Sequence, residues 1–238
     1  MRLPHFPLHT VLFPHLPLPL HMFEQRYRAM ARDVVADDSP YAGRFVVSMI
    51  TRGLEAGDPN AETRQIGTIC EVRSAEQLSD GRWVLLCVGL ARVRLGAVDR
   101  SGPYAVVDVE PLAEETGAVG ATALSEVQAA LDEYMATVKR FVTRTASMGH
   151  DSQEISRVAA SLDEVLKPIH LPDDPLAASY AVGGVLQIEL TRKQQLLELP
   201  DAASRLRAEL DLLRRESRLL SEGAMPPVST SDLGYNPN

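Results

Sequence analysis

In the first 112 positions, the apolar residues occur in short runs, and these runs are separated by residues typical of turns. The runs Ile66–Val72 and Trp83–Val88 predict two strands, and Asp80-Gly81 between them favours a tight hairpin turn. The same half contains two more strand-like runs and one helical segment, at Arg44–Thr51, Tyr104–Val109 and Phe23–Val35. Five or six strands at this spacing predict a small, mostly antiparallel β-barrel over residues 1–112, with one inserted helix.

From about residue 118 the apolar positions follow a helical period instead. Six of them recur at steps of three and four residues and predict one long helix: Leu124, Val127, Leu131, Tyr134, Val138 and Phe141. Further helices are expected from Asp151, from Asp174-Pro175, over Thr191–Leu199, and from Pro200-Asp201 to about Leu220. The pattern predicts an α-helical bundle over residues 118–222 and a disordered tail at 223–238, and therefore an α+β protein.

Composition and charge narrow the class of protein. The 238 residues carry a formal net charge of −8, which disfavours a general nucleic-acid binder. No apolar run approaches the roughly 18 residues that a membrane span requires. Prolines interrupt the N-terminal apolar region, so we expect no secretory signal and a cytoplasmic location.

The two cysteines point to the same compartment. A hairpin folded at Asp80-Gly81 would place Cys70 opposite about residue 91 and Cys87 opposite about residue 74. The two thiols would then lie about 13 Å apart along the strands, beyond the reach of a disulfide. We therefore expect two buried, reduced thiols, which are typical of a cytosolic protein.

Motifs that bind phosphate or carry catalysis are absent from the sequence. It contains no G-x-x-x-x-G-K-[ST] loop, no G-x-G-x-x-G turn, no G-x-S-x-G elbow and no H-E-x-x-H. Four histidines crowd the first 21 residues, at His5, His9, His15 and His21, but no carboxylate occurs before Glu24. We expect these histidines to act independently, with no metal site, no cofactor and no catalytic residues.

The segment Phe13–Tyr27 is the hardest to explain by packing alone. Its large apolar residues cannot all face one side of a strand, because neighbouring side chains alternate. The even-numbered positions 16, 18, 20 and 22 form the predicted core face. Phe23 then points away, with Tyr27 one helical turn further on, and the pair is predicted to form part of a polypeptide-binding groove. The alternative is that both rings fill the core.

Four stretches in the same order resemble the N-terminal, substrate-recognition domain of Lon proteases, above all its stand-alone bacterial form. They are Phe6–Pro14 with Pro17–Tyr27, Ile66-Gly67-Thr68-Ile69, Asp80-Gly81-Arg82 with Gly89–Val93, and Gln194–Glu198 with Arg205-Leu206. Gln25 and Val93 depart from the family pattern, where Pro and Phe are usual. The resemblance covers residues 1 to about 222.

The resemblance implies a barrel of the pseudouridine-synthase-associated (PUA-like) type followed by a helical bundle. It also implies capture of unfolded or tagged polypeptides. The ATPase module and the Ser/Lys protease domain of Lon have no counterpart in these 238 residues, so we expect no enzymatic activity. The leading expectation is a recognition module that binds exposed apolar segments of polypeptides, with a protease or another protein as a further partner. The alternative is a small-molecule or RNA binder that uses the PUA-like barrel.

Overall fold

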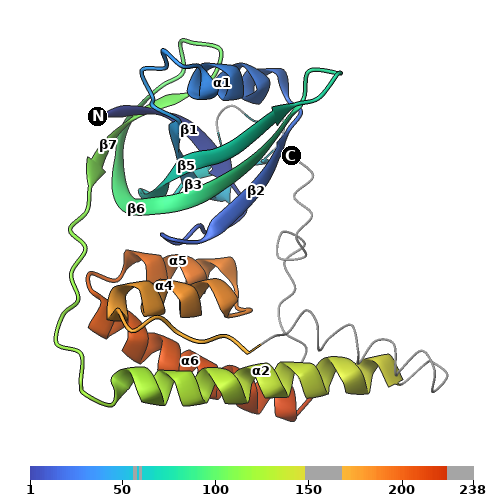
Figure 1. Ribbon diagram of the computed structural model, residues 1–238, viewed down its shortest axis with the longest axis vertical. Helices are drawn as coiled ribbons and strands as arrows, with labels where there is room; N and C mark the ends of the chain where they lie inside the picture. Colours follow the sequence, from blue (N-terminus) through green and yellow to red (C-terminus); the bar gives the residue numbers. More distant parts are fainter. Residues whose placement is uncertain (56–57, 59–60, 148–167, 224–238) are drawn as a thin grey trace. The chain divides into compact units, whose positions relative to one another are not determined.

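The computed structural model describes residues 1–55, 58, 61–147 and 168–223 (Figure 1). Seven strands lie in the first half of the chain: β1 (Arg2–Leu8), β2 (Pro17–Met22), β3 (Arg44–Arg52), β4 (Glu62–Thr63), β5 (Ile66–Gln77), β6 (Trp83–Asp99) and β7 (Val106–Pro111). The described helices are α1 (Gln25–Val35), α2 (Ala123–Ser147), α4 (Pro175–Val185), α5 (Leu190–Glu198) and α6 (Ala202–Ser221). None of these helices is long and apolar enough to cross a membrane.

The strands pair into one sheet that closes on itself. The order is β1-β7-β6-β5-β3-β4, and β1 also pairs with β3, so five strands form a ring. Only the β1–β3 pairing is parallel; the others are antiparallel, as the hairpin pattern predicted. β6 is the longest strand at 17 residues, and it pairs with β5, β7 and β2. β6 is therefore the strand that connects most of the sheet.

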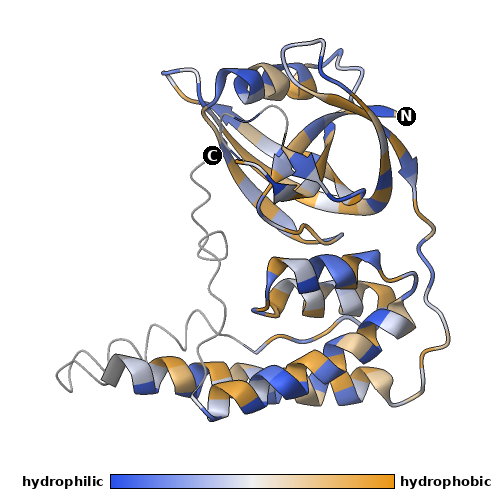
Figure 2. Ribbon diagram, turned by 180° about the vertical axis from the view of Figure 1, so that it is seen from behind, coloured by the Kyte–Doolittle hydropathy of each residue, from blue (hydrophilic) through white to orange (hydrophobic). Residues whose placement is uncertain are grey.

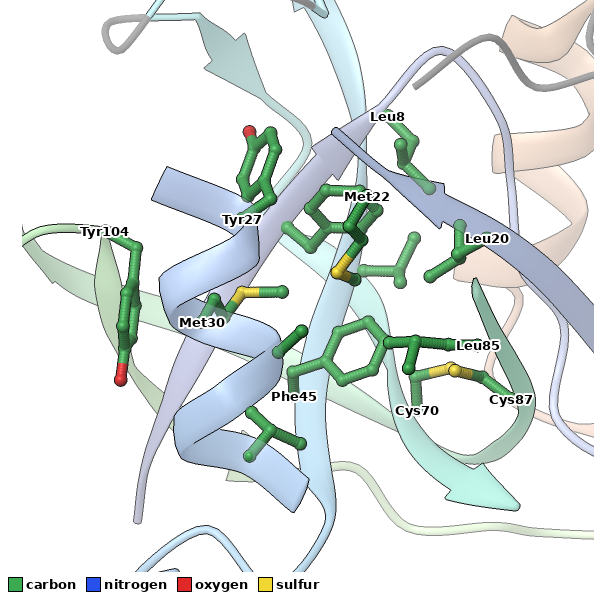
Figure 3. Close-up of a cluster of buried hydrophobic side chains, with 14 of the residues drawn as sticks. Leu8, Leu20, Met22, Tyr27, Met30, Phe45, Cys70, Leu85, Cys87 and Tyr104 are labelled. Carbon is green, nitrogen blue, oxygen red and sulfur yellow. The ribbon is translucent and has the colours of Figure 1, made fainter. Parts of the chain in front are cut away.

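Two apolar clusters lie on opposite faces of the sheet. On β3, Phe45 and Val47 belong to the larger cluster, whereas Val46 between them belongs to the smaller one. The larger cluster also includes Val34 of α1 and Met30 of the same helix, of which Met30 is labelled in Figure 3. The smaller cluster takes residues from all five strands of the ring: Leu3, Val46, Ile69, Val93, Val107 and Val109.

Glycines in two of the motifs allow close backbone approaches. A Cβ on Gly67 would lie 2.3 Å from the carbonyl oxygen of Val47. A Cβ on Gly89 would lie 2.5 Å from the carbonyl oxygen of Phe13. Both contacts are with backbone, which cannot move aside easily, so each position requires glycine. Thr68, beside Gly67, donates its hydroxyl to the carbonyl of Leu12 at 2.5 Å.

The guanidinium of Arg92 joins α5 to the sheet. Arg92 is 2% exposed. It donates to the carbonyl oxygens of residues at the end of α5 and after β7, namely Leu197, Leu199, Pro200 and Ala113. Its Nε also lies 3.3 Å from both carboxylate oxygens of Glu114. A second link is the buried side chain of Gln194, which donates to the carbonyl of Ile66 at 2.9 Å.

These contacts assign α5 to the strand-containing unit. The described residues of 1–115 and 188–200 form one compact unit, and those of 116–187 and 201–227 form a second. The contiguous division predicted from the sequence instead places 188–200 with the bundle. In the second unit α6 packs against α2 and α4, and α2 alternates apolar and polar residues along its length (Figure 2). The helical period of the sequence predicted α5, but it did not indicate that this helix belongs to the unit that contains the strands.

Helix starts in the second half agree with the capping residues. Asp174 accepts from the backbone N–H of Ala177 at 2.8 Å, with proline at the next position. Asp201 accepts from the N–H of Ser204 at 2.7 Å. The predicted helix from Asp151 and the predicted disordered tail lie outside the described residues, apart from Gly223.

The two cysteines are buried and free, as expected, but the predicted separation is wrong. Cys70 pairs with Gly89 and Cys87 with Val72, because two register shifts interrupt the β5–β6 ladder. The thiols therefore lie side by side in the core, where a hydrogen bond from one to the other and burial raise the pKa of Cys70 (Figure 3). Bulges of this kind have no clear sequence signal, so counting from the turn gave the wrong partners.

Glu209 on α6 is a buried carboxyl group of the second unit. The residue is 0% exposed, and neither carboxylate oxygen has a hydrogen-bond partner among the residues that the structure describes. Burial raises the pKa of this carboxyl well above its usual value, and the nearby charge of Arg205 opposes that shift. The guanidinium of Arg205 instead lies over the ring of Tyr180 and donates to the hydroxyl of Ser179.

Replacing Arg92 should detach α5 from the sheet. We expect Arg92→Met to lower the free energy of unfolding by about 3–5 kcal/mol, because it leaves buried carbonyl oxygens without their donor and removes the ion pair with Glu114. Urea unfolding measures the loss, and amide exchange should rise first in residues 190–200. Arg94→Met is the matched control, since Arg94 is exposed on the same strand. Equal unfolding free energies for the two variants would contradict the role of Arg92.

Glu209 should make the stability of the helical unit depend on pH. Because the native pKa is raised, the carboxyl stays protonated in the folded state while the unfolded chain ionises above about pH 4.3. The wild type should therefore lose about 1.4 kcal/mol for each pH unit over which this difference persists, relative to Glu209→Gln. Thermal unfolding followed at 222 nm from pH 4.5 to 8 measures the divergence. A constant difference across this range would show that Glu209 is ionised in the native state.

Candidate functional site

The two faces of the β2–β6 pair differ in exposure. Leu20, Met22, Leu85 and Cys87 are buried in the larger apolar cluster. The alternate residues pair across the other face, with His21 opposite Val84, Pro19 opposite Leu86, and Pro17 opposite Val88. We name these six residues the β2–β6 face. The predicted core parity of residues 16–22 agrees with this, although Leu16 and Leu18 are only partly buried.

The β2–β6 face contains exposed large apolar side chains. Among the described residues, four large hydrophobics are exposed, and two of them are Val84 at 42% and Leu86 at 45%. The other two, Met1 and Leu54, lie elsewhere in the chain. Pro17 and Pro19 are exposed beside them on β2. Adjacent exposed side chains of this kind form an apolar patch instead of scattered single residues.

Phe23 extends this face beyond the end of β2. It is partly buried, and its ring centroid lies 6.3 Å from that of His21, with the rings tilted at 51°. Since His21 pairs with Val84, Phe23 lies near the same surface. Phe23 is therefore neither fully buried nor fully exposed, and His21 and Val84 are neighbours that the sequence-based hypothesis did not include.

Tyr27 lies in the core and not in a surface groove. It is 3% exposed and lies among the buried side chains of the larger apolar cluster (Figure 3). Its ring meets the ring of Phe6 edge-on, with centroids 4.4 Å apart. The guanidinium of Arg26 lies 4.4 Å from the Tyr27 ring centroid. Burial raises the pKa of the hydroxyl, which has no hydrogen-bond partner among the described residues. Tyr27 faces inward because α1 packs its apolar side on the sheet, so the expected exposure of this ring is corrected.

The β5 side of the face is polar. Glu76 lies opposite Val84, and Glu71 lies opposite Val88. Glu71 pairs with Arg73 at 2.7 Å and with Arg44 at 3.4 Å, so its charge is compensated. The apolar column of β6 therefore has prolines on one side and charged residues on the other, an arrangement found in protein-binding surfaces.

The four N-terminal histidines lie in different environments. His5 is buried and shares a 2.7 Å hydrogen bond with the hydroxyl of Ser48, and burial lowers its pKa to about 4. His9 Nδ1 lies 3.4 Å from a carboxylate oxygen of Glu55. In the described ranges no group of three or more His, Cys, Asp and Glu side chains could hold a metal ion.

Sequence reasoning missed Val84 and Leu86, although a signal was present. Residues 83–88 are all apolar, and in a strand at least one of two alternating sets must face away from the core. The same reasoning selected Phe23 from the preceding segment. Applied to β6, it would have identified the residues that pair with β2.

Comparison with known proteins places the chain in a family. The sequence model of the ATP-dependent protease La (LON) substrate-binding domain matches residues 2–215. The Lon protease 2 of Syntrophobacter fumaroxidans is 25% identical over 82% of this chain, and that of Myxococcus xanthus is 25% identical over 92%. The matched parts make up 22% and 24% of those proteins. The chain thus spans about a quarter of the length of these relatives.

Solved structures show the same fold. The crystal structure of a Lon N-terminal domain protein from Xanthomonas campestris matches with a TM-score of 0.58 and 19% identity, over 89% of this chain and 98% of that chain. The N-terminal domain of the Mycobacterium avium complex Lon protease matches with a TM-score of 0.55, again at 19% identity, over 90% and 98%. The predicted α+β fold and the predicted resemblance are confirmed, and the chain belongs to the family of the ATP-dependent protease La (LON) substrate-binding domain.

Proposed function

We propose that this chain is a non-enzymatic recognition module that binds exposed apolar segments of unfolded or tagged polypeptides. The observation that carries the proposal is the β2–β6 face, where Val84 and Leu86 remain exposed beside the prolines of β2. Fully burying one large apolar side chain contributes about 1.5–3 kcal/mol. Two or three such contacts give micromolar affinity once the cost of association is subtracted.

Phe23 and Tyr27 have different roles in this proposal. Phe23 contacts the bound segment at the end of the face, because part of its ring is accessible near His21. Tyr27 is a positioning residue, which holds the start of α1 on the core through Phe6. In this proposal the β2–β6 face, with Phe23 at one end, takes the place of the groove predicted from the sequence.

The edge of β2 favours recognition by side chains over strand addition. Within the described residues β2 pairs only with β6, which leaves one edge open. Strand addition needs backbone donors along that edge, but Pro17 and Pro19 have no N–H. A bound segment therefore lies across the face and is held by its apolar side chains.

Family membership supports a role in substrate binding and leaves the partner open. The family description names a substrate-binding domain, and the curated relatives are named as proteases. We propose that a protease or another protein receives the bound polypeptide. The free, buried cysteines are consistent with the proposed cytoplasmic location.

Polar substitutions on the β2–β6 face should weaken polypeptide binding. We expect Leu86→Ser to reduce affinity for reduced, alkylated lactalbumin about tenfold, and Phe23→Ala to reduce it about threefold to tenfold. The reason is the loss of apolar area at the contact. Fluorescence anisotropy with the labelled, permanently unfolded protein measures both changes.

Leu54→Ser provides the matched control for this experiment, because Leu54 is 69% exposed and belongs to neither strand of the face. All three variants should unfold within about 1 kcal/mol of the wild type, since none of the residues is fully buried. Equal weakening by Leu54→Ser would refute the assignment of the face. Loss of about 3–5 kcal/mol in Phe23→Ala would instead identify Phe23 as a core residue.

The alternative, an RNA or small-molecule binder, is tested in the same series. RNA binding should weaken steeply between 50 and 200 mM salt, as phosphate contacts require, whereas binding of apolar segments should change little. Salt-sensitive RNA binding without lactalbumin binding would replace the proposed function.

The purified 238-residue chain should neither hydrolyse ATP nor cleave casein. The sequence has no phosphate-binding loop, and the family match is to a substrate-binding domain. Phosphate release and casein electrophoresis measure the two activities. ATP-dependent casein cleavage that disappears when a serine of this chain is mutated would show that the chain is an enzyme.

A further inference from the structure

A pocket lies between the end of α1 and the loop that joins β6 to β7. Its volume of about 430 Å³ is at the lower end of the range of ligand sites and is sufficient for one side chain with water. The ionisable side chains that line it are those of Arg2, Asp33, Tyr41, Asp99 and Tyr104. It shares no residue with the β2–β6 face.

Hydrogen bonds hold the aromatic part of the pocket in place. The hydroxyl of Tyr104 donates to Oδ2 of Asp33 at 2.7 Å, and Tyr104 packs beside α1 (Figure 3). Burial and the hydrogen bonds to Asp33 and Tyr41 raise the pKa of Tyr104, so its hydroxyl remains a donor at any physiological pH. The other carboxylate oxygen of Asp33 has no partner within the described part of the chain. It is the acceptor that a ligand can use.

The neighbouring carboxylate already binds a guanidinium. Asp99 Oδ2 accepts from Arg2 at 2.9 Å, and its Oδ1 accepts from the backbone N–H and the hydroxyl of Ser101. Arg2 also lies 3.5 Å from Asp108. Asp99 is thus saturated and the charge of Arg2 is compensated, which leaves Asp33 as the uncompensated group of the pocket.

The position of Asp33 on its helix also favours a cation. Asp33 lies in the last turn of α1, which ends at Val35. The carbonyl groups at a helix C-terminus repel a carboxylate and attract positive charge. Helix stability therefore does not explain Asp33, whereas a bound cation would interact favourably with both the carboxylate and the helix end.

We propose that this pocket binds a guanidinium group, with Asp33 as its anionic partner and Tyr41 and Tyr104 as its aromatic walls. A planar guanidinium pairs with a carboxylate and stacks on aromatic rings, which a compact ammonium does less well. Anions are disfavoured, because Asp33, Asp99 and the adjacent Asp108 outnumber Arg2. The guanidinium comes from free arginine or from an arginine side chain of a bound polypeptide.

Peptides without apolar residues test this pocket separately from the β2–β6 face. The probes are a Gly-Ser peptide with one central arginine, the same peptide with citrulline or lysine, and free arginine. Amide chemical shifts of the ¹⁵N-labelled chain follow each titration. We expect saturable shifts around Tyr41 and Ser101 with the arginine peptide, about fivefold weaker binding of the lysine peptide, and none with citrulline.

Asp33→Asn keeps an acceptor for the hydroxyl of Tyr104 and removes the negative charge. We therefore expect it to weaken binding of the arginine peptide at least fivefold. Asp37→Asn, an exposed change of the same charge just beyond α1, should alter binding less than twofold. Equal binding of the citrulline and arginine peptides, equal effects of the two variants, or no saturable shift would overturn the proposal. Binding of free arginine as tight as that of the peptide identifies a small-molecule site, and tighter peptide binding identifies a polypeptide site. Neither result depends on whether the chain binds lactalbumin, so this experiment tests the pocket independently of the proposed function.

Discussion

The strand-containing unit depends on one buried guanidinium. The side chain of Arg92, on β6, donates hydrogen bonds to carbonyl groups at and just after the end of α5. Carbonyl groups at a helix end have no partner within the helix. Arg92 also holds Ala113 and Glu114, where the chain leaves the sheet after β7. A buried guanidinium requires nearly all its donors to be used, and here some of the acceptors lie 105 and 108 positions further along the chain than Arg92. Arg92 lies on β6 and several of its acceptors lie at the end of α5. The guanidinium is therefore satisfied only when α5 is packed against the sheet.

The motifs that carry the family resemblance are explained mainly by geometry. Gly67 and Gly89 allow other backbone segments to approach, and Gln194 binds the first residue of β5. None of these residues lies on the β2–β6 face. Another stretch of the resemblance, Pro17–Tyr27, contains Pro17, Pro19 and His21 of the face and also Phe23. The motifs therefore cover both the construction of the unit and the β2 side of the face, whereas Val84 and Leu86 on β6 lie outside them.

Periodicity was sufficient for most elements of this fold. The alternation in β2, the turn at Asp80-Gly81 and the stripe along α2 each follow from local sequence, and the structure contains all three. Three features depend on distant contacts and could not be derived that way. The pairing of Cys70 depends on bulges, the burial of Tyr27 depends on Phe6, and the location of α5 depends on Arg92. In each of these three cases the local sequence is compatible with more than one partner, and a distant contact selects one of them.

The return of residues 188–200 to the strand unit has a consequence for biosynthesis. The chain completes its last strand at Pro111, but the acceptors of Arg92 on α5 follow only at Leu197–Pro200. On the ribosome the sheet must therefore wait for nearly 90 more residues before its buried charge is satisfied. Folding of the first unit therefore cannot finish until the chain from Thr116 to Gln187, which is assigned to the second unit, has been synthesised. A fragment that stops after β7 reproduces this unfinished stage and not a domain.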